Sequence, residues 1–154
     1  MRRFRRLFVA FASLALVAAS VAVLSAGSSR EAVALVQSLY DVQDRMVRSS
    51  GYSIFASEGT TARYFAKRYV GRIDPRSLGF DPLYGSRNRT VSELIVAPQS
   101  PGAFVDGAYF VTVRVTAGGT PHRLTYTLRD VGPQRALRIV DIRGSGWRLS
   151  QLVR

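Results

Sequence analysis

Few side chains in this sequence belong to the types that form catalytic or metal-binding sites. The chain has one histidine, His122, and no cysteine. Histidine-based catalysis needs a nucleophile beside the ring, and zinc sites need further histidines or cysteines. The sequence contains no Gly-x-Ser-x-Gly elbow, phosphate-binding loop, dinucleotide-binding glycine motif or calcium loop. We therefore expect His122 to serve at the surface or in packing, and we expect neither a metal nor a cofactor.

Two arginines are the clearest candidates for holding an anion. Arg114 and Arg123 lie in two candidate strands that the Gly118-Gly119 bend joins. A two-residue hairpin fixes the register, and counting inward from the bend places Arg114 directly opposite Arg123. Like charges in this position repel, so an anion, a carboxylate or open solvent should lie beside them. The pair is a candidate clamp for an anionic ligand. The alternative is solvated repulsion that a neighbouring acid relieves.

The same register brings two hydrophobic sets onto one face of the hairpin. The apolar positions of residues 107–116 and 123–129 coincide without adjustment, which supports the pairing. The facing pairs are Val113 with Leu124, Val111 with Tyr126, and Tyr109 with Leu128. These side chains should line a concave face, on which Tyr109 and Tyr126 are candidate ligand-binding residues.

A third strand, expected over residues 137–142, carries the acid of most interest. It has apolar side chains on both faces, so it should be covered on both sides. The alternation leaves its parity open. If Ile139 joins the concave face, Asp141 does so too and lies near Tyr126. The alternative is that Asp141 caps or hydrogen-bonds local backbone and that the tyrosines belong to the core.

Two helices should precede these strands. Ser28 and Glu31 have the spacing of a capping box, and apolar residues then recur at three- and four-residue steps as far as Met46, before Gly51. A second helix is expected from Thr61 to Val70. Its expected inner face consists of Ala62, Phe65, Ala66 and Tyr69.

Turns and one further strand should connect the helices to the hairpin. Residues 72–90 contain Asp74-Pro75 and Asp81-Pro82, which are turn sequences, so this stretch should be mostly loop. We expect Asp81 to organise its own turn rather than to bind a ligand. Residues 90–97 are a candidate strand, bounded by Pro98.

The first 26 residues have the composition of an export signal. Four arginines precede an apolar run from Leu7 to Leu24, and small residues follow at once. The run is also at the lower limit for crossing a bilayer, so the segment is either cleaved or kept as an inner-membrane anchor over residues 7–24. We favour cleavage, because no positive cluster closes the run. This predicts a periplasmic or extracellular protein, exported by the general or the twin-arginine route.

Residues 27–154 have the size and composition of one domain. The chain is 47% hydrophobic, which is typical of a globular protein, and its net charge is +12, of which the signal carries four. Such a basic product can associate with an anionic envelope surface made of lipid headgroups or wall polymers. No nucleic-acid-binding motif occurs, and we expect no nucleic acid as partner.

Two short motifs carry a resemblance to a known family. Phe80-Asp81-Pro82-Leu83 and the strand sequence of residues 137–142 resemble an exported bacterial family of unknown function, domain of unknown function thirty-eight twenty-eight. The resemblance covers about residues 30–154. The chain departs from the family's pattern at Leu137, where tryptophan is usual, and at Arg87-Asn88, where an acidic residue is common. The element order is similar to the cone-shaped fold of nuclear transport factor two and ketosteroid isomerase. This implies an α+β protein whose N-terminal helices pack on a curved antiparallel sheet.

Three functions remain open at this point. The first is an exported, non-enzymatic binding or accessory module, whose concave face takes a small ligand or a partner segment through Tyr109, Tyr126, Asp141, Arg114 and Arg123. The second is implied by the resemblance: a small acid–base enzyme of the ketosteroid isomerase type, with Asp141 and Tyr126 in an apolar cone that raises the pKa of the acid. The third is a basic protein held on the envelope surface. The ligand and the oligomeric state stay open.

Overall fold

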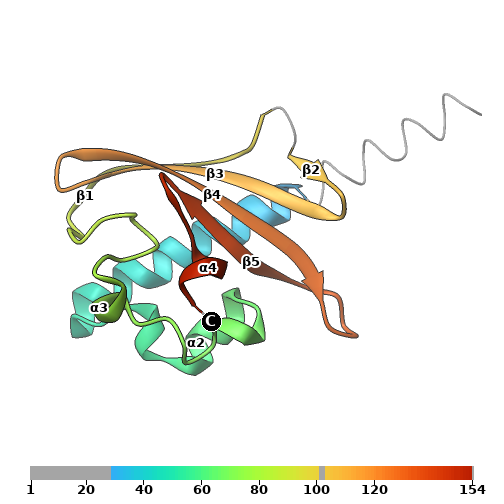
Figure 1. Ribbon diagram of the computed structural model, residues 1–154, viewed down its shortest axis with the longest axis horizontal. Coiled ribbons are helices and arrows are strands. Elements are labelled where there is room, and N and C mark those ends of the chain that lie inside the picture. The colour runs from blue at the N-terminus through green and yellow to red at the C-terminus, as the bar shows by residue number, and fades with distance from the viewer. Residues whose placement is uncertain (1–28, 101–102, 154) are drawn as a thin grey trace, which may run out of the picture.

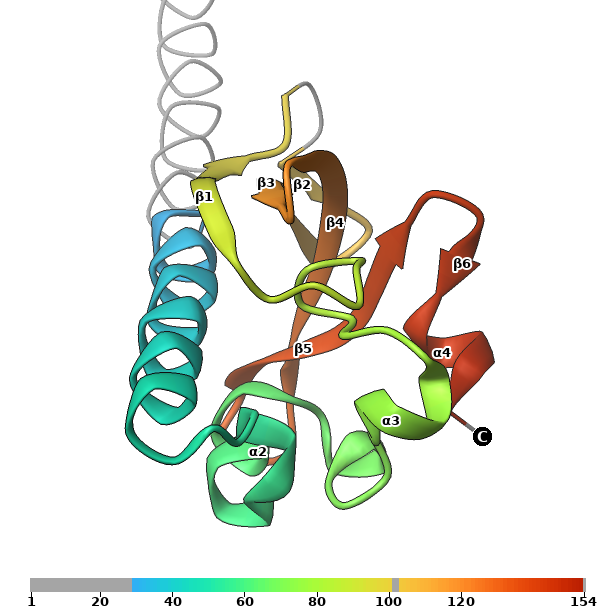
Figure 2. The ribbon, with the colours of Figure 1, turned by 90° about the vertical axis from the view of Figure 1, so that its left-hand side faces the viewer.

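The frame of the protein is an antiparallel sheet with helices packed against one of its faces (Figures 1 and 2). The computed structural model describes residues 29–100 and 103–153. The expected signal or anchor, residues 1–26, and Ser28 of the expected capping box lie outside the described residues. Within the described residues, the structure contains no helix that is long and apolar enough to cross a membrane. The expected α+β class is confirmed.

In the described part of the chain the sheet has six strands. They are β1 (Val91–Pro98), β2 (Phe104–Val105), β3 (Ala108–Ala117), β4 (Thr120–Val131), β5 (Ala136–Gly144) and β6 (Trp147–Arg148). Their order is β1-β3-β4-β5-β6, and β2 pairs with β3 beyond the end of β1. The helical elements are a helix over residues 29–50, η1 (Ile54–Ala56), α2 (Glu58–Tyr64), η2 (Lys67–Tyr69), α3 (Pro75–Leu78) and α4 (Leu149–Leu152).

The β3–β4 hairpin has the predicted register in every pair. Val113 faces Leu124, and Arg114 faces Arg123. Gly118 and Gly119 both have positive φ, which a side chain would resist, and they form the tight bend that sets this pairing. The apolar face of the hairpin is buried and forms the floor of the core.

The helix over residues 29–50 covers that floor. Ala32, Val36 and Leu39 are fully buried on one stripe, as their spacing predicts, and the helix ends at Gly51 with φ of 72°. Tyr40 and Gln43 extend the stripe and are also buried. The concave face predicted to take a ligand is therefore filled by this helix.

The expected second helix over residues 61–70 is wrong in its bounds. Helix α2 begins after Ser57, whose side chain accepts from the Thr60 amide, and it ends at Tyr64. Phe65 then pairs with Ile139 of β5, and the Ala66 amide donates to the Ile139 carbonyl at 2.9 Å. This pairing with a strand far away in sequence overrides the local helical pattern. Phe65 and Tyr69 are buried as expected, but Ala62 is exposed.

A bulge in β5 settles the parity that the alternation leaves open. Leu128 pairs with Ile139 and Thr127 pairs with Asp141, so Val140 is an extra residue between the two pairs. Ile139 and Ile142 are both fully buried as a result, and Asp141 pairs with Thr127, whose side chain lies on the face of β4 opposite to that of Tyr126. The conditional prediction that Asp141 follows Ile139 onto the inner face is wrong for this reason. The Val140 carbonyl accepts from the hydroxyl of Tyr69 at 2.8 Å and from Arg68.

The opposed arginines give a direct test of the hairpin. Arg114→Glu replaces a like-charge pair with an opposite-charge pair across β3 and β4. We expect the free energy of unfolding to stay equal or to rise, by roughly 0.2–1 kcal/mol. Urea unfolding at low and high salt checks this, because added salt should stabilise the wild type more than the variant. A clear loss of stability in Arg114→Glu would contradict the repulsion.

Candidate functional site

The turn around Asp81 is held by several backbone and side-chain hydrogen bonds. Asp81 is only 2% exposed, and its Oδ1 accepts from the Leu83 amide at 3.0 Å. Its backbone carbonyl accepts from the amides of Tyr84 and Gly85, and its own amide donates to the Ser86 carbonyl at 2.9 Å. Asp81 therefore organises its turn, as its place before a proline predicts.

Two buried tyrosines fasten this turn to the helix and to the sheet. The hydroxyl of Tyr40, from the helix over residues 29–50, donates to the Leu83 carbonyl. The same hydroxyl lies 2.8 Å from that of Tyr126 on β4. Tyr84 packs on the Tyr40 ring with centroids 6.1 Å apart. Both backbone groups of Leu83 are thus satisfied, and a loop, a helix and a strand meet at one point.

Burial keeps these tyrosines protonated. It raises the pKa of Tyr40 well above its ordinary value, with the nearby Tyr126 adding to the shift. It also raises the pKa of Tyr126, and it raises the pKa of Tyr84 to about 12. At neutral pH these groups are therefore neutral hydrogen-bonding residues. Tyr126 is fully buried, so the structure does not present this expected ligand-binding residue to solvent.

Asp141 and Tyr126 are not brought together. The Oδ1 atom of Asp141 accepts from the Ile142 amide and from the Ser150 amide, each at 3.0 Å. Ser150 lies in the first turn of α4, so Asp141 holds the start of that helix. These bonds agree with the alternative stated from the sequence, in which Asp141 caps or hydrogen-bonds local backbone.

The remaining expected site residues lie at the other end of the hairpin or on its outer face. Tyr109 is half-buried and packs on Phe104 of β2, with centroids 4.7 Å apart. Arg114 and Arg123 are exposed and border a small hollow that Glu93 of β1 also lines. Glu93 accepts from the Thr116 hydroxyl, and within the described residues no ion pair joins it to either arginine.

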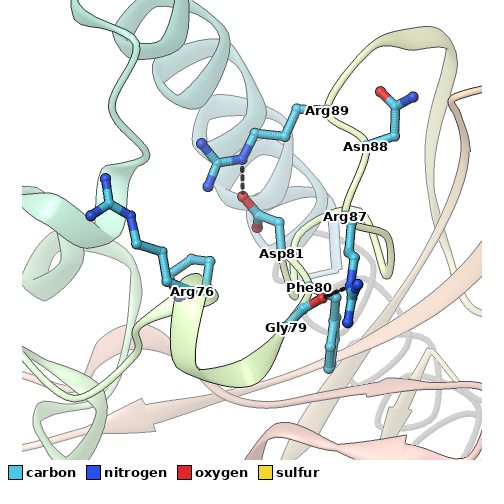
Figure 3. Close-up of a pocket in the computed structure, with 8 residues that line it drawn as sticks. Arg76, Gly79, Phe80, Asp81, Arg87, Asn88 and Arg89 are labelled. Atoms are coloured by element: carbon cyan, nitrogen blue, oxygen red, sulfur yellow. Dashed lines mark hydrogen bonds and ion pairs between the residues drawn. The ribbon is translucent and has the colours of Figure 1, made fainter.

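A cleft that the sequence analysis missed lies beside the Asp81 turn. It has a volume of about 830 Å³ and its lining includes Arg76, Phe80, Asp81, Arg87, Asn88 and Arg89; we call it the arginine cleft. Figure 3 shows the guanidinium groups of Arg76 and Arg89 on one side of Asp81 and that of Arg87 on the other. Arg89 Nε lies 3.0 Å from Asp81 Oδ2, and Arg87 Nε donates to the Gly79 carbonyl at 2.5 Å. The turn therefore orients two of the three arginines.

A second hollow adjoins the first and shares Gly79, Phe80 and Arg87 with it. It has a volume of about 670 Å³ and its lining includes Phe80, Arg87, His122, Arg123, Arg143 and Trp147; we call it the Trp147 groove. The rings of Phe80 and Trp147 lie 4.9 Å apart. A Cβ at Gly144 would lie 2.3 Å from Trp147 Cε2, so only glycine admits the ring there. Among the residues that the structure describes, no carboxylate lines this groove.

The arginines of the two hollows are largely uncompensated. Within residues 29–100 and 103–153, the ion pairs are Arg48 with Asp44, Arg89 with Asp81, and Arg135 with Asp130. Arg76, Arg87, Arg123 and Arg143 are therefore outside every ion pair of the described chain. Residues 29–100 and 103–153 also contain no group of three or more acidic or histidine side chains arranged for a metal ion. The arrangement is suited to holding anions.

The sequence did carry signals for the missed residues. Tyr40 is a polar-tipped residue on an otherwise apolar helical stripe, and three arginines flank the Asp81-Pro82 turn within fourteen positions, Arg76 to Arg89. Their convergence depends on the fold, because Arg143 and Trp147 come from the far end of the chain.

Comparison of the chain with known protein families, curated proteins and solved structures found no match in any of the three.

The tyrosine pair predicts an order of stability losses. Tyr40→Phe leaves the Leu83 carbonyl and the Tyr126 hydroxyl without their shared partner, and we expect it to cost about 1–3 kcal/mol. Tyr126→Phe removes one bond but leaves Tyr40 bonded to Leu83, and we expect it to cost about 1 kcal/mol or less. Urea unfolding measures both. Equal losses, or a larger loss in Tyr126→Phe, would count against the fastening role of Tyr40.

Asp81 predicts a pH dependence. Burial raises the pKa of Asp81, although the Leu83 amide and Arg89 oppose the shift. Between its unfolded pKa, about 3.9, and the higher folded pKa, the folded state binds more protons than the unfolded state. The free energy of unfolding should then fall as pH rises through this window, and Asp81→Asn should lack this component. Urea unfolding of both proteins from pH 4 to pH 7 checks the sign, and a pH-independent difference between them would refute it.

Proposed function

We propose that this protein is an exported, non-enzymatic binding module that holds an anionic partner at the arginine cleft and the Trp147 groove. One observation carries the proposal: four arginines that lie outside every ion pair of the described chain border two adjoining hollows. Guanidinium groups bind carboxylates and phosphates through paired hydrogen bonds, and they stay charged at all physiological pH values. A concave surface with one sign of charge also concentrates ions of the opposite sign.

The binding surface in this proposal differs from the concave sheet face expected from the sequence. That face is covered by the helix over residues 29–50, and Tyr126 is fully buried beneath it. The Trp147 groove lies instead where the Asp81 turn meets the first half of β4 and the β5–β6 turn, and the arginine cleft adjoins it. Arg123 is the one expected ligand-binding residue that borders them.

The acid–base enzyme receives less support. A general acid or base must come within hydrogen-bonding reach of a substrate. Tyr40 and Tyr126 bond to each other in the core, and Asp141 is engaged at the start of α4. Asp81 lines the arginine cleft, but its carboxylate is held by the Leu83 amide and by Arg89.

We also propose that the sheet is of the cone-shaped type found in nuclear transport factor two and ketosteroid isomerase, and that the chain is related to the exported family of unknown function named above. The helix packed on the inner face of the sheet is consistent with that architecture, as is the bulge in β5, which bends a strand.

The proposal that the protein is exported rests on the composition of residues 1–26. Cell fractionation and mass spectrometry of the mature N-terminus test it.

Reversal of the charge of Arg87, which lines both hollows, tests the binding function. The full chain, purified in a nonionic detergent, is titrated with sodium polyphosphate while Trp147, the only tryptophan, is followed by fluorescence. We expect Arg87→Glu to weaken binding roughly tenfold or more, the effect of losing a charge-assisted hydrogen bond and adding repulsion. Arg129→Glu is the matched control, since this exposed arginine lines neither hollow. Equal effects of the two variants, or no binding at all, would reject the proposal.

A further inference from the structure

We propose that the partner is an extended acidic segment of another protein, which lies along the two joined hollows and places an apolar side chain against Phe80 and Trp147. This inference rests on the proposed function and names the kind of anion that the site takes. Three features of the hollows carry it, namely their continuity, their aromatic pair and the serine hydroxyls that line the Trp147 groove.

The two hollows are too open and too widely charged for a small ion. They are continuous through Gly79, Phe80 and Arg87. Their arginines come from α3, from the loop after the Asp81 turn, and from strands β4 and β5. A single phosphate contacts only the arginines within hydrogen-bonding reach of its own oxygens, whereas a chain with several carboxylates can contact the arginines of both hollows in succession. Small-molecule sites usually enclose their ligand, but Arg76, Arg87 and Arg143 are exposed here.

The aromatic pair favours a peptide over a purely ionic polymer. Phe80 and Trp147 are each half-buried, with ring centroids 4.9 Å apart, in the groove that also holds Arg87 and Arg143. Tryptophan and arginine are the residue types that contribute most at protein interfaces. A partner with both acidic and apolar side chains satisfies both features, whereas a polyanion without apolar groups satisfies only the charge.

Two short side chains with hydroxyl groups, Ser86 and Ser145, also line the Trp147 groove. A hydroxyl oxygen accepts hydrogen bonds, so the amides of an extended peptide in the groove can donate to them. The space beside Gly144 is filled by the Trp147 ring and that beside Gly85 by Leu124 and His122, so these two glycines allow the side chains of the groove to pack closely.

A peptide series tests the proposal. Two fluorescein-labelled octapeptides are compared by anisotropy with the full chain in nonionic detergent: one with six glutamates and two leucines, and one with serine in place of each leucine. Polygalacturonate and inorganic phosphate serve as competitors. We expect the leucine peptide to bind roughly tenfold more tightly than the serine peptide, as burial of a leucine side chain predicts. Phe80→Ala should abolish this preference.

Charge and aromatic effects separate in the variants. Arg143→Glu should weaken both peptides by a similar factor of about ten or more, because it reverses a charge that both peptides meet. Arg129→Glu should change neither by more than about twofold. Thermal unfolding confirms that each variant is folded, and the comparison of the two peptides on the unmodified chain keeps the test valid if Phe80→Ala does not fold.

The outcomes distinguish the two proposals. A leucine preference that Phe80→Ala removes supports a peptide partner. Equal binding of both peptides, or displacement by polygalacturonate as effective as by the leucine peptide, overturns the peptide partner while the anion-binding function stands. Absence of binding by every anionic probe, or insensitivity to both Arg87→Glu and Arg143→Glu, overturns the function as well.

Discussion

The hydrogen bonds of the Leu83 backbone are the constraint on which the rest of this structure depends. The Leu83 amide donates to the Asp81 carboxylate, and the Leu83 carbonyl accepts from the Tyr40 hydroxyl, which also forms a hydrogen bond with the Tyr126 hydroxyl. All of these groups are buried, where an unpaired polar atom is costly and a paired one is stronger than in water. The loop, the helix over residues 29–50 and β4 are therefore committed to one relative arrangement. Removal of any partner leaves a polar group without its bond inside the core.

This arrangement separates the part of the protein that gives stability from the part proposed to bind. The tyrosines and Asp81 are inside, and Arg76, Arg87 and Asn88 project outside from the same turn and its flanks. Because hydrogen bonds already hold the backbone around Arg76 and Arg87, little backbone flexibility is lost when a partner binds to them. Arg89 connects the two parts, because it pairs with the buried carboxylate while its side chain remains partly exposed.

Local patterns predicted the parts of the fold that local interactions determine. The two-glycine bend and the alternation on either side of it were enough for the full β3–β4 register, and the helical stripe from Ala32 to Leu39 lies where its spacing places it. The end of α2 at Tyr64 could not be predicted in this way, because it follows from pairing with Ile139, more than seventy positions away. The site was missed for the same reason. Tyr40 and Tyr126 are far apart in the sequence, as are Phe80 and Trp147, and each pair comes into contact only through the tertiary fold.

The extra residue at Val140 shows that the length of β5 carries information that its composition does not. The residues on either side of it keep their buried positions only because one position is skipped in the pairing with β4. Chains of this kind should tolerate exchange of Val140 for another aliphatic residue, since the skip itself is a property of the backbone. Regular pairing with Val140 retained would turn over the part of the strand after it, carry Asp141 toward the apolar interior and Ile142 toward water, and free the start of α4. Over evolutionary time, changes that remove the skip while keeping the residue should therefore be selected against more strongly than exchanges among aliphatic residues at Val140.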